Sequence, residues 1–170
     1  MKAAVPFAML IAAALAAPAA LAAPAPKARV ATVDELAKPL PLPYNEAANA
    51  DADVAAAKAR ARTSGKKLLI DLGGNWCGDC RVLAGIMKIP EVNAFVRRHY
   101  EVVAVDVGRF DKNGQVAARY GIKGRLEGVP AVLVVDPRND RLVNAGHVTA
   151  LADARHMTPQ ALADWLAQWV

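Results

Sequence analysis

Three short apolar runs limit what this chain can fold into more than any other feature of its sequence. They span residues 67–72, 101–106 and 131–135, and Val, Leu or Ile dominates each of them. Apolar runs of this length are typical of buried strands. Stretches with helical patterns separate them, and strands that alternate with helices predict an α/β sheet with a parallel part.

Helical patterns and turn signals supply the remaining elements. Helices are expected at residues 46–63, 77–86, 91–99 and 113–120, and from Pro159 onward. The last of these begins with Thr158 as a capping residue, followed by proline at the first helical position. Turn residues at 136–140 predict that residues 141–145 return as an antiparallel hairpin partner. We therefore expect one domain of the α/β class, with a central mixed sheet, a C-terminal antiparallel hairpin and flanking helices.

The first 22 residues have the pattern of a secretory signal peptide. Met1-Lys2 provides a positive start, and a long alanine-rich stretch without charge follows. Ala20-Leu21-Ala22 is a small-x-small cleavage pattern. The leader explains much of the hydrophobic fraction of 55%, so that figure does not indicate an unusually apolar domain. A signal peptide predicts a periplasmic or secreted protein.

An uncleaved membrane anchor is the alternative interpretation of the same segment. The uncharged stretch from residue 3 to residue 26 is long enough to span a bilayer. Alanine is barely apolar on transfer scales, however, and four prolines interrupt the stretch. These two properties favour cleavage over retention.

Between the leader and the domain lies a segment rich in proline and alanine. It covers residues 23–45 and includes Pro39-Leu40-Pro41-Leu42-Pro43. Such composition predicts an extended, semi-rigid lead-in. The folded domain is then expected at residues 46–170.

The charge pattern argues against several classes of partner. The formal net charge of +5 has no long run of Lys or Arg behind it, so we expect no nucleic-acid partner. His99, His147 and His156 are scattered, and none lies at metal-ligand spacing from another. We expect no metal site, no cofactor beyond the cysteines, and a monomer.

One motif carries the chemistry of this sequence. Trp76-Cys77-Gly78-Asp79-Cys80 follows a predicted buried strand and opens a predicted helix. A cysteine at a helix N-terminus faces free backbone N–H groups, which favour the thiolate and therefore the nucleophile. The second cysteine lies three residues further on, and so on the same helix face, where it can form a disulfide with the first.

The two cysteines are too close in sequence to serve as a structural staple. A bridge that closes so short a loop stabilises the folded state little. In an exported protein, which meets an oxidising compartment, a lone pair of this kind is most simply a redox centre.

Three separate places make the chain resemble the thioredoxin-fold family, over roughly residues 51–170. They are the Cys77-Gly78-Asp79-Cys80 motif with Trp76 before it, the acid Asp71 in the preceding strand, and Gly128-Val129-Pro130 before a later strand. The helix that ends in Gly-Lys-Lys before the first strand is similar to that of secreted members, including the C-terminal domain of periplasmic disulfide-interchange reductases. The resemblance implies a thioredoxin fold.

The resemblance also implies catalytic roles for three residues. Cys77 would be the attacking thiol, and Cys80 the resolving thiol. Asp71 would be a buried proton acceptor for Cys80, with a pKa raised by burial.

Substrate binding in the family implies three further roles. Pro130 would follow a cis peptide bond, which holds the backbone of Val129 open to a substrate strand. Trp76 would pack beside the disulfide and shape the contact surface.

Two departures from the family pattern affect the site. The stretch 123–127 makes the approach to Val129-Pro130 longer than in plain thioredoxins, so it alters the rim of the substrate groove. The family also often pairs its buried acid with a lysine on the next strand, whereas residues 102–105 read Val-Val-Ala-Val.

The dipeptide between the cysteines, Gly78-Asp79, is expected to tune the redox pair. A carboxylate at Asp79 should disfavour the thiolate of Cys77 and so raise its pKa. A less stabilised thiolate makes the reduced form less favoured, which indicates a reductant more than an oxidant.

The predicted function is thiol–disulfide exchange with disulfide-bearing exported proteins. Electrons would return from a membrane or periplasmic donor. Two alternatives use the same residues: a copper-binding module, with Cys77 and Cys80 holding Cu(I), and a docking module without redox chemistry. Two thiolates can hold Cu(I), whereas a tetrahedral zinc site needs four ligands.

Overall fold

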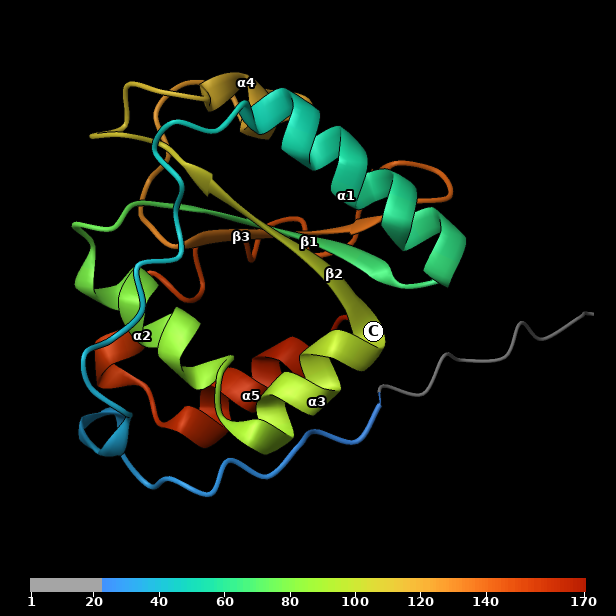
Figure 1. The fold of residues 1–170 in the computed structure, drawn as a ribbon. Helices are drawn as coiled ribbons and strands as arrows, with labels where there is room; N and C mark the ends of the chain where they lie inside the picture. Colours follow the sequence, from blue (N-terminus) through green and yellow to red (C-terminus); the bar gives the residue numbers. More distant parts are fainter. Residues whose placement is uncertain (1–22) are drawn as a thin grey trace, which may run out of the picture.

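A four-stranded mixed sheet forms the centre of the structure, a computed structural model that describes residues 23–170 (Figure 1). The strands are β1 (Lys67–Gly73), β2 (Tyr100–Asp106), β3 (Ala131–Asp136) and β4 (Arg141–Leu142), in the spatial order β2-β1-β3-β4. β1 pairs in parallel with β2 and antiparallel with β3, and β3 pairs antiparallel with β4. The mixed sheet and the C-terminal hairpin are confirmed. The predicted signal peptide at residues 1–22 lies outside the described residues.

Helices cover both faces of the sheet. They are α1 (Ala50–Ser64), α2 (Gly78–Ile86), α3 (Pro90–His99), α4 (Gly114–Ala118) and α5 (Pro159–Ala167). α1 and α4 pack on one face, and α2, α3 and α5 pack on the other (Figure 1). The order of elements agrees with the sequence prediction, and α1 begins four residues later than expected, where the Asn49 side chain caps it. None of the helices in residues 23–170 is long and apolar enough to cross a membrane.

Strand β1 is buried on both faces and holds the two halves of the core together. Leu68, Ile70 and Leu72 point into the core beneath α1, whereas Leu69 points into the core beneath α2, α3 and α5. This alternation follows from the period of two in a strand. β1 lies between β2 and β3, and only four residues separate its carboxyl end at Gly73 from the start of α2 at Gly78.

The lead-in at residues 23–45 is mostly extended, apart from the 3₁₀ helix Val33–Glu35, and it packs on the domain along its length. Leu36 and Tyr44 are buried. Arg81 of α2 donates to the carbonyl oxygens of Leu40 at 2.8 Å and of Pro41 at 3.2 Å. The segment is therefore an integral part of the domain and contributes two side chains to its interior.

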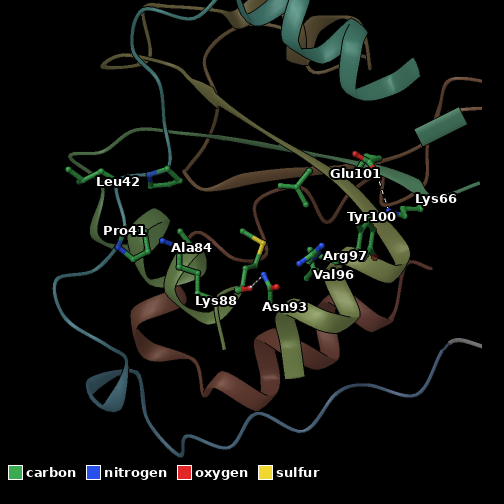
Figure 2. Close-up of a pocket in the computed structure, with 13 residues that line it drawn as sticks. Pro41, Leu42, Lys66, Ala84, Lys88, Asn93, Val96, Arg97, Tyr100 and Glu101 are labelled. Carbon is green, nitrogen blue, oxygen red and sulfur yellow. Dashed lines mark hydrogen bonds and ion pairs between the residues drawn. The ribbon is translucent and has the colours of Figure 1, made fainter. Parts of the chain in front are cut away.

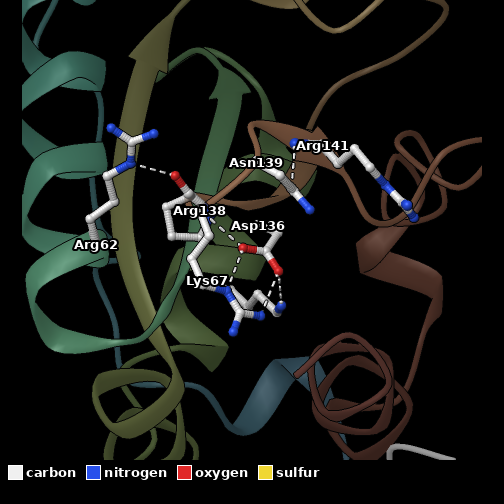
Figure 3. A network of polar contacts seen from close by, with 7 residues as sticks. Arg62, Lys67, Asp136, Arg138, Asn139 and Arg141 are labelled. Carbon is white, nitrogen blue, oxygen red and sulfur yellow. Dashed lines mark hydrogen bonds and ion pairs between the residues drawn. The ribbon is translucent and has the colours of Figure 1, made fainter. Parts of the chain in front are cut away.

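A polar network secures the turn between β3 and β4 (Figure 3). The carboxylate of Asp136 accepts hydrogen bonds from Arg138 and from Lys67 of β1, at 2.9 to 3.1 Å. Hydrogen bonds from Arg138, together with the neighbouring Lys67, hold the pKa of Asp136 well below its usual range. Arg62 of α1 donates to the Pro137 carbonyl oxygen at 2.6 Å. The turn is thus tied to β1 and to α1.

Strand β4 is shorter than the predicted 141–145. Beyond Leu142, a side chain forms hydrogen bonds to β3 in place of the β4 backbone. The amide of Asn144, which is fully buried, accepts from the Val134 N–H and donates to the Val132 carbonyl oxygen, both at 2.8 Å. It completes the hydrogen bonding of β3 where the backbone of β4 has turned away. Two buried backbone groups of the sheet therefore depend on one side chain.

We expect Asn144→Ala to lower the free energy of unfolding by about 2–4 kcal/mol, since it leaves two buried backbone groups without a partner. Urea denaturation followed by far-UV circular dichroism measures the loss. Val143→Ala, at an exposed neighbouring position, is the matched control and should cost much less. Equal losses in the two variants would contradict the importance of this amide.

Candidate active site

The sulfur of Cys77 occupies the N-cap of α2. Its side chain accepts the backbone N–H of Cys80 at 3.2 Å, which is the role that a Ser or Asp oxygen usually fills. The positive end of the helix dipole lies at the same place. Both effects favour the thiolate over the thiol. The helix begins at Gly78, so the sequence prediction of a cysteine at the helix start is confirmed.

The pKa of Cys77 is lowered to about 7, chiefly by a hydrogen bond from the side chain of Cys80. Burial opposes this shift, and the backbone N–H of Cys80 adds to it. The expectation that the pKa of Cys77 is raised is therefore wrong, because the pKa is lower than the ordinary value of a cysteine. The charge of Asp79 does act in the expected sense, but the hydrogen bonds to the sulfur outweigh it.

Arg155 explains why the carboxylate of Asp79 has so little effect. Its backbone N–H and its Nε both donate to the Asp79 carboxylate, at 2.9 and 3.1 Å. The ion pair balances a charge that is almost fully buried. A side chain at Gly78 would press on the Arg155 Cδ at 3.3 Å, so glycine leaves the room that Arg155 needs. Sequence analysis missed Arg155, which lies 76 residues from its partner with no motif around it.

Cys80 has the opposite electrostatic environment to Cys77. It is fully buried, and its pKa is raised by its hydrogen bond to Cys77 and by burial. Cys77 therefore ionises first and Cys80 keeps its proton. The two sulfurs, three residues apart, are prepared for different steps of one reaction.

Asp71 lies two residues before the end of β1, with 1% of its surface exposed, and its pKa is raised to about 7 by burial. The hydroxyl of Tyr44 donates to its carboxylate, at 3.0 Å from each oxygen, and partly offsets the effect of burial. The raised pKa agrees with the direction predicted from the sequence. At neutral pH, Asp71 can accept and return a proton.

Tyr44 is a site residue that sequence analysis missed. The side chain of Asn75, just before the motif, accepts from the Tyr44 N–H at 3.1 Å and donates to its carbonyl oxygen at 2.8 Å. A Cβ atom at Gly73 would overlap both the Tyr44 hydroxyl and the Cys80 sulfur. The side chains of Tyr44, Asp71 and Cys80 therefore lie close together in the interior of the domain. Tyr44 supplies the polar partner of the acid in a chain whose β2 has no lysine at residues 102–105.

The loop before β3 closes the site from the other side. The Val129–Pro130 peptide bond is cis, as predicted, and the thiol of Cys77 donates to the Val129 carbonyl oxygen at 3.4 Å. Trp76 is 40% exposed, and its Nε1 donates to the Gly108 carbonyl oxygen at 2.7 Å. The predicted substrate-binding residues thus lie beside Cys77, on the loop between β1 and α2 and on the loop that precedes β3.

A cavity lies away from this chemistry (Figure 2). It has a volume of about 560 Å³ and is bounded by Pro41–Pro43 of the lead-in, the C-terminal end of α2, α3 and β2. Cys77 and Cys80 do not line it. Within residues 23–170, no three His, Cys, Asp or Glu side chains are grouped so that they could hold a metal ion.

A pair of unequal thiols at a helix start, beside a buried acid and a cis-proline loop, defines a thiol–disulfide oxidoreductase with a CxxC pair. Comparison with known proteins agrees. The family described as thioredoxin-like matches residues 48–137. The chain belongs to this thioredoxin-like family.

Two individual proteins illustrate the relationship. Thioredoxin 1 of Synechococcus elongatus is 31% identical over 88 residues, which are 51% of this chain and 74% of that protein. The crystal structure of disulphide isomerase from Xylella fastidiosa Temecula1 superposes with a TM-score of 0.68 and 37% identity, over 75% of this chain and 96% of that one.

We expect Asp71→Asn to remove a pH-dependent loss of stability. An acid whose pKa rises from about 4 in the unfolded chain to about 7 in the folded chain weakens folding as pH rises through that window. Between pH 4 and pH 8, the stability of the reduced wild-type protein should fall by on the order of 2–4 kcal/mol more than that of the variant. Urea denaturation at each pH measures it.

Asp53→Asn, on the exposed side of α1, is the matched control and should follow the wild-type curve. Parallel curves for wild type and Asp71→Asn would show that Asp71 does not carry the shift.

Proposed function

We propose that this protein reduces disulfides of exported proteins in the periplasm or outside the cell. The observation that carries the proposal is the pair of unequal sulfurs, with Cys77 activated at the helix start and Cys80 protonated beside Asp71. The signal-peptide pattern at residues 1–22 supports export. We further propose that the protein acts as a monomer, without a cofactor and without nucleic acid.

The reaction proceeds in two exchanges. The Cys77 thiolate attacks one sulfur of the substrate disulfide, the S–S bond breaks, and the released substrate sulfur leaves with the electron pair and takes up a proton. Asp71 then accepts the proton of Cys80, and the Cys80 sulfur attacks the Cys77 sulfur in the mixed disulfide. The substrate leaves with two thiols, and the protein holds a Cys77–Cys80 disulfide. A membrane or periplasmic donor of two electrons must reduce it again.

The proposed direction of electron flow is based on the stability of the Cys77 thiolate. A strong oxidase stabilises its reduced form with a thiol pKa of about 3.5, whereas the pKa in thioredoxin is about 7. The pKa of about 7 at Cys77 lies with the second group. This supports a reductant, although the cause differs from the one expected at the sequence level, since Asp79 is neutralised by Arg155.

A second candidate is disulfide isomerisation. The solved structure that superposes on 75% of this chain is described as a disulphide isomerase, which favours this reaction. Isomerisation uses the same attack by Cys77 and ends when a different substrate thiol, instead of Cys80, releases the mixed disulfide. The copper-binding and docking alternatives use the same two thiols without this exchange.

The alkylation rate of reduced protein should report the activated sulfur. Since the thiolate is the nucleophile, the rate with iodoacetamide should rise with a midpoint near pH 7 and level off above it. Mass spectrometry should place the label on Cys77, and Cys77→Ser should not be labelled in this range. A midpoint near 8.5, the ordinary value for cysteine, would contradict the activation.

The reduction potential of the Cys77–Cys80 pair separates the candidate functions. We expect a value between about −270 and −200 mV, measured against glutathione or dithiothreitol buffers, and catalysed reduction of insulin. Cys80→Ser should accumulate the mixed disulfide, whereas Cys77→Ser should be inactive. A potential near −120 mV would indicate an oxidase. Refolding of a scrambled disulfide protein would show isomerisation, and tight stoichiometric Cu(I) binding without reduction of insulin would indicate the copper module.

A further inference from the structure

Two arginines and two aromatic rings form a contiguous row at the rim of the thiol site. The rings of Trp76 and Phe110 lie 5.8 Å apart. The guanidinium of Arg109 lies over Trp76 at 4.7 Å from the ring centroid, and that of Arg125 over Phe110 at 4.3 Å. Trp76 directly precedes Cys77, so this row, which we name the arginine–aromatic row, begins at the residue next to the attacking cysteine.

The row joins two segments that sequence analysis kept apart. Arg109 and Phe110 lie in the loop that follows β2, and Arg125 lies in the stretch 123–127 that lengthens the approach to Pro130. The loop after β2 is held by the hydrogen bond from Trp76 Nε1 to Gly108, and the added stretch by the buried side chain of Leu126. The added stretch therefore extends the rim of the substrate groove.

Both arginines keep their charge available to a partner. Arg109 and Arg125 are exposed, and neither forms a salt bridge within residues 23–170. Packing on a ring face orients a guanidinium and leaves the edges that carry its N–H groups free. An arginine oriented in advance loses less conformational entropy when it binds a carboxylate.

The local charge is positive even though Lys112 forms an ion pair with Asp106, at 3.8 Å. Segments 108–112 and 123–127 contain four basic and two acidic residues. One of the acids, Asp111, already accepts the Arg109 backbone N–H at 2.8 Å, and the other, Glu127, is exposed. Across the Cys77 sulfur, Arg155 keeps 58% of its side chain exposed while it neutralises Asp79. The excess of positive charge therefore lies on the side of the site formed by segments 108–112 and 123–127.

We infer that the arginine–aromatic row is a docking surface for partner segments that carry Asp or Glu beside the reacting cysteine. The inference rests on the proposed function and names the substrate class of that site. Carboxylates would form bidentate pairs with Arg109 and Arg125, and apolar side chains would lie on the exposed part of Trp76. Opposite charge also steers the encounter and raises the association rate.

Three substrates test this inference. Two peptides of equal length carry the same internal disulfide, with Asp and Glu flanking the cysteines in one and Lys in the other, and hydroxyethyl disulfide is the neutral reference. Reduced protein is mixed with each under single-turnover conditions, and the released thiols are quantified after acid quenching. We expect the acidic peptide to react roughly 10–100 times faster than the basic peptide at low salt. The ratio should shrink at 0.5 M salt, at which screening shortens the range of the charges to about 4 Å.

Variants of the row connect the preference to its residues. The double change Arg109→Gln and Arg125→Gln should bring the ratio of acidic to basic rates to within about threefold of one, whereas Arg109→Lys and Arg125→Lys should keep most of it. Arg141→Gln, which removes one exposed charge at the β3–β4 hairpin, is the matched control and should keep the wild-type ratio.

Three results would overturn the inference. The first is a wild-type ratio near one, and the second is a ratio that survives the double Gln change. Either of these leaves the proposed function standing if hydroxyethyl disulfide is reduced. The third is a wild-type protein that reduces none of the three disulfides, which would contradict the proposed function and the docking surface together.

Discussion

The hydrogen bond from the Cys80 N–H to the Cys77 sulfur is the interaction on which the site depends. It forms at the start of α2, which follows directly on β1, the strand buried between β2 and β3. The same placement puts Asp71, near the carboxyl end of β1, close enough for its charge to act on Cys80. The cysteine at this N-cap has a structural and a chemical role, because its sulfur caps α2 and the start of α2 stabilises its thiolate.

Around this cap, each buried charge has a partner from a distant part of the chain. Arg155 balances Asp79 on one side of Cys77, and Tyr44 donates to Asp71 on the other. Without Arg155, the buried carboxylate of Asp79 would oppose the thiolate that the helix start stabilises. The lead-in has a related role, because it brings Tyr44 into the interior. The site is thus built from α2 and β1 together with residues from distant segments, Tyr44 from the lead-in and Arg155 from a short 3₁₀ helix.

Much of the fold could be predicted because its signals are local. The apolar runs at β1, β2 and β3 and the cap at Thr158 each rest on a few neighbouring residues, and the structure agrees with them. The position of Cys77 at a helix start was predictable for the same reason. The pKa of Cys77 was not, because its sign depends on which of several opposing contacts is strongest. Asp79 was visible in the motif, whereas its partner Arg155 was not.

By itself, the sequence determined the order of helices and strands, the CxxC pair at a helix start and the acid in the preceding strand, because spacing and periodicity act within one element. The tertiary structure decided the partners of that pair. Tyr44 lies 27 residues from Asp71, and Arg155 lies 76 residues from Asp79. Arg109 and Arg125 meet the two aromatic rings only where separate loops converge beside Cys77. Contacts over such separations arise from how the elements pack on the sheet, which no local pattern encodes.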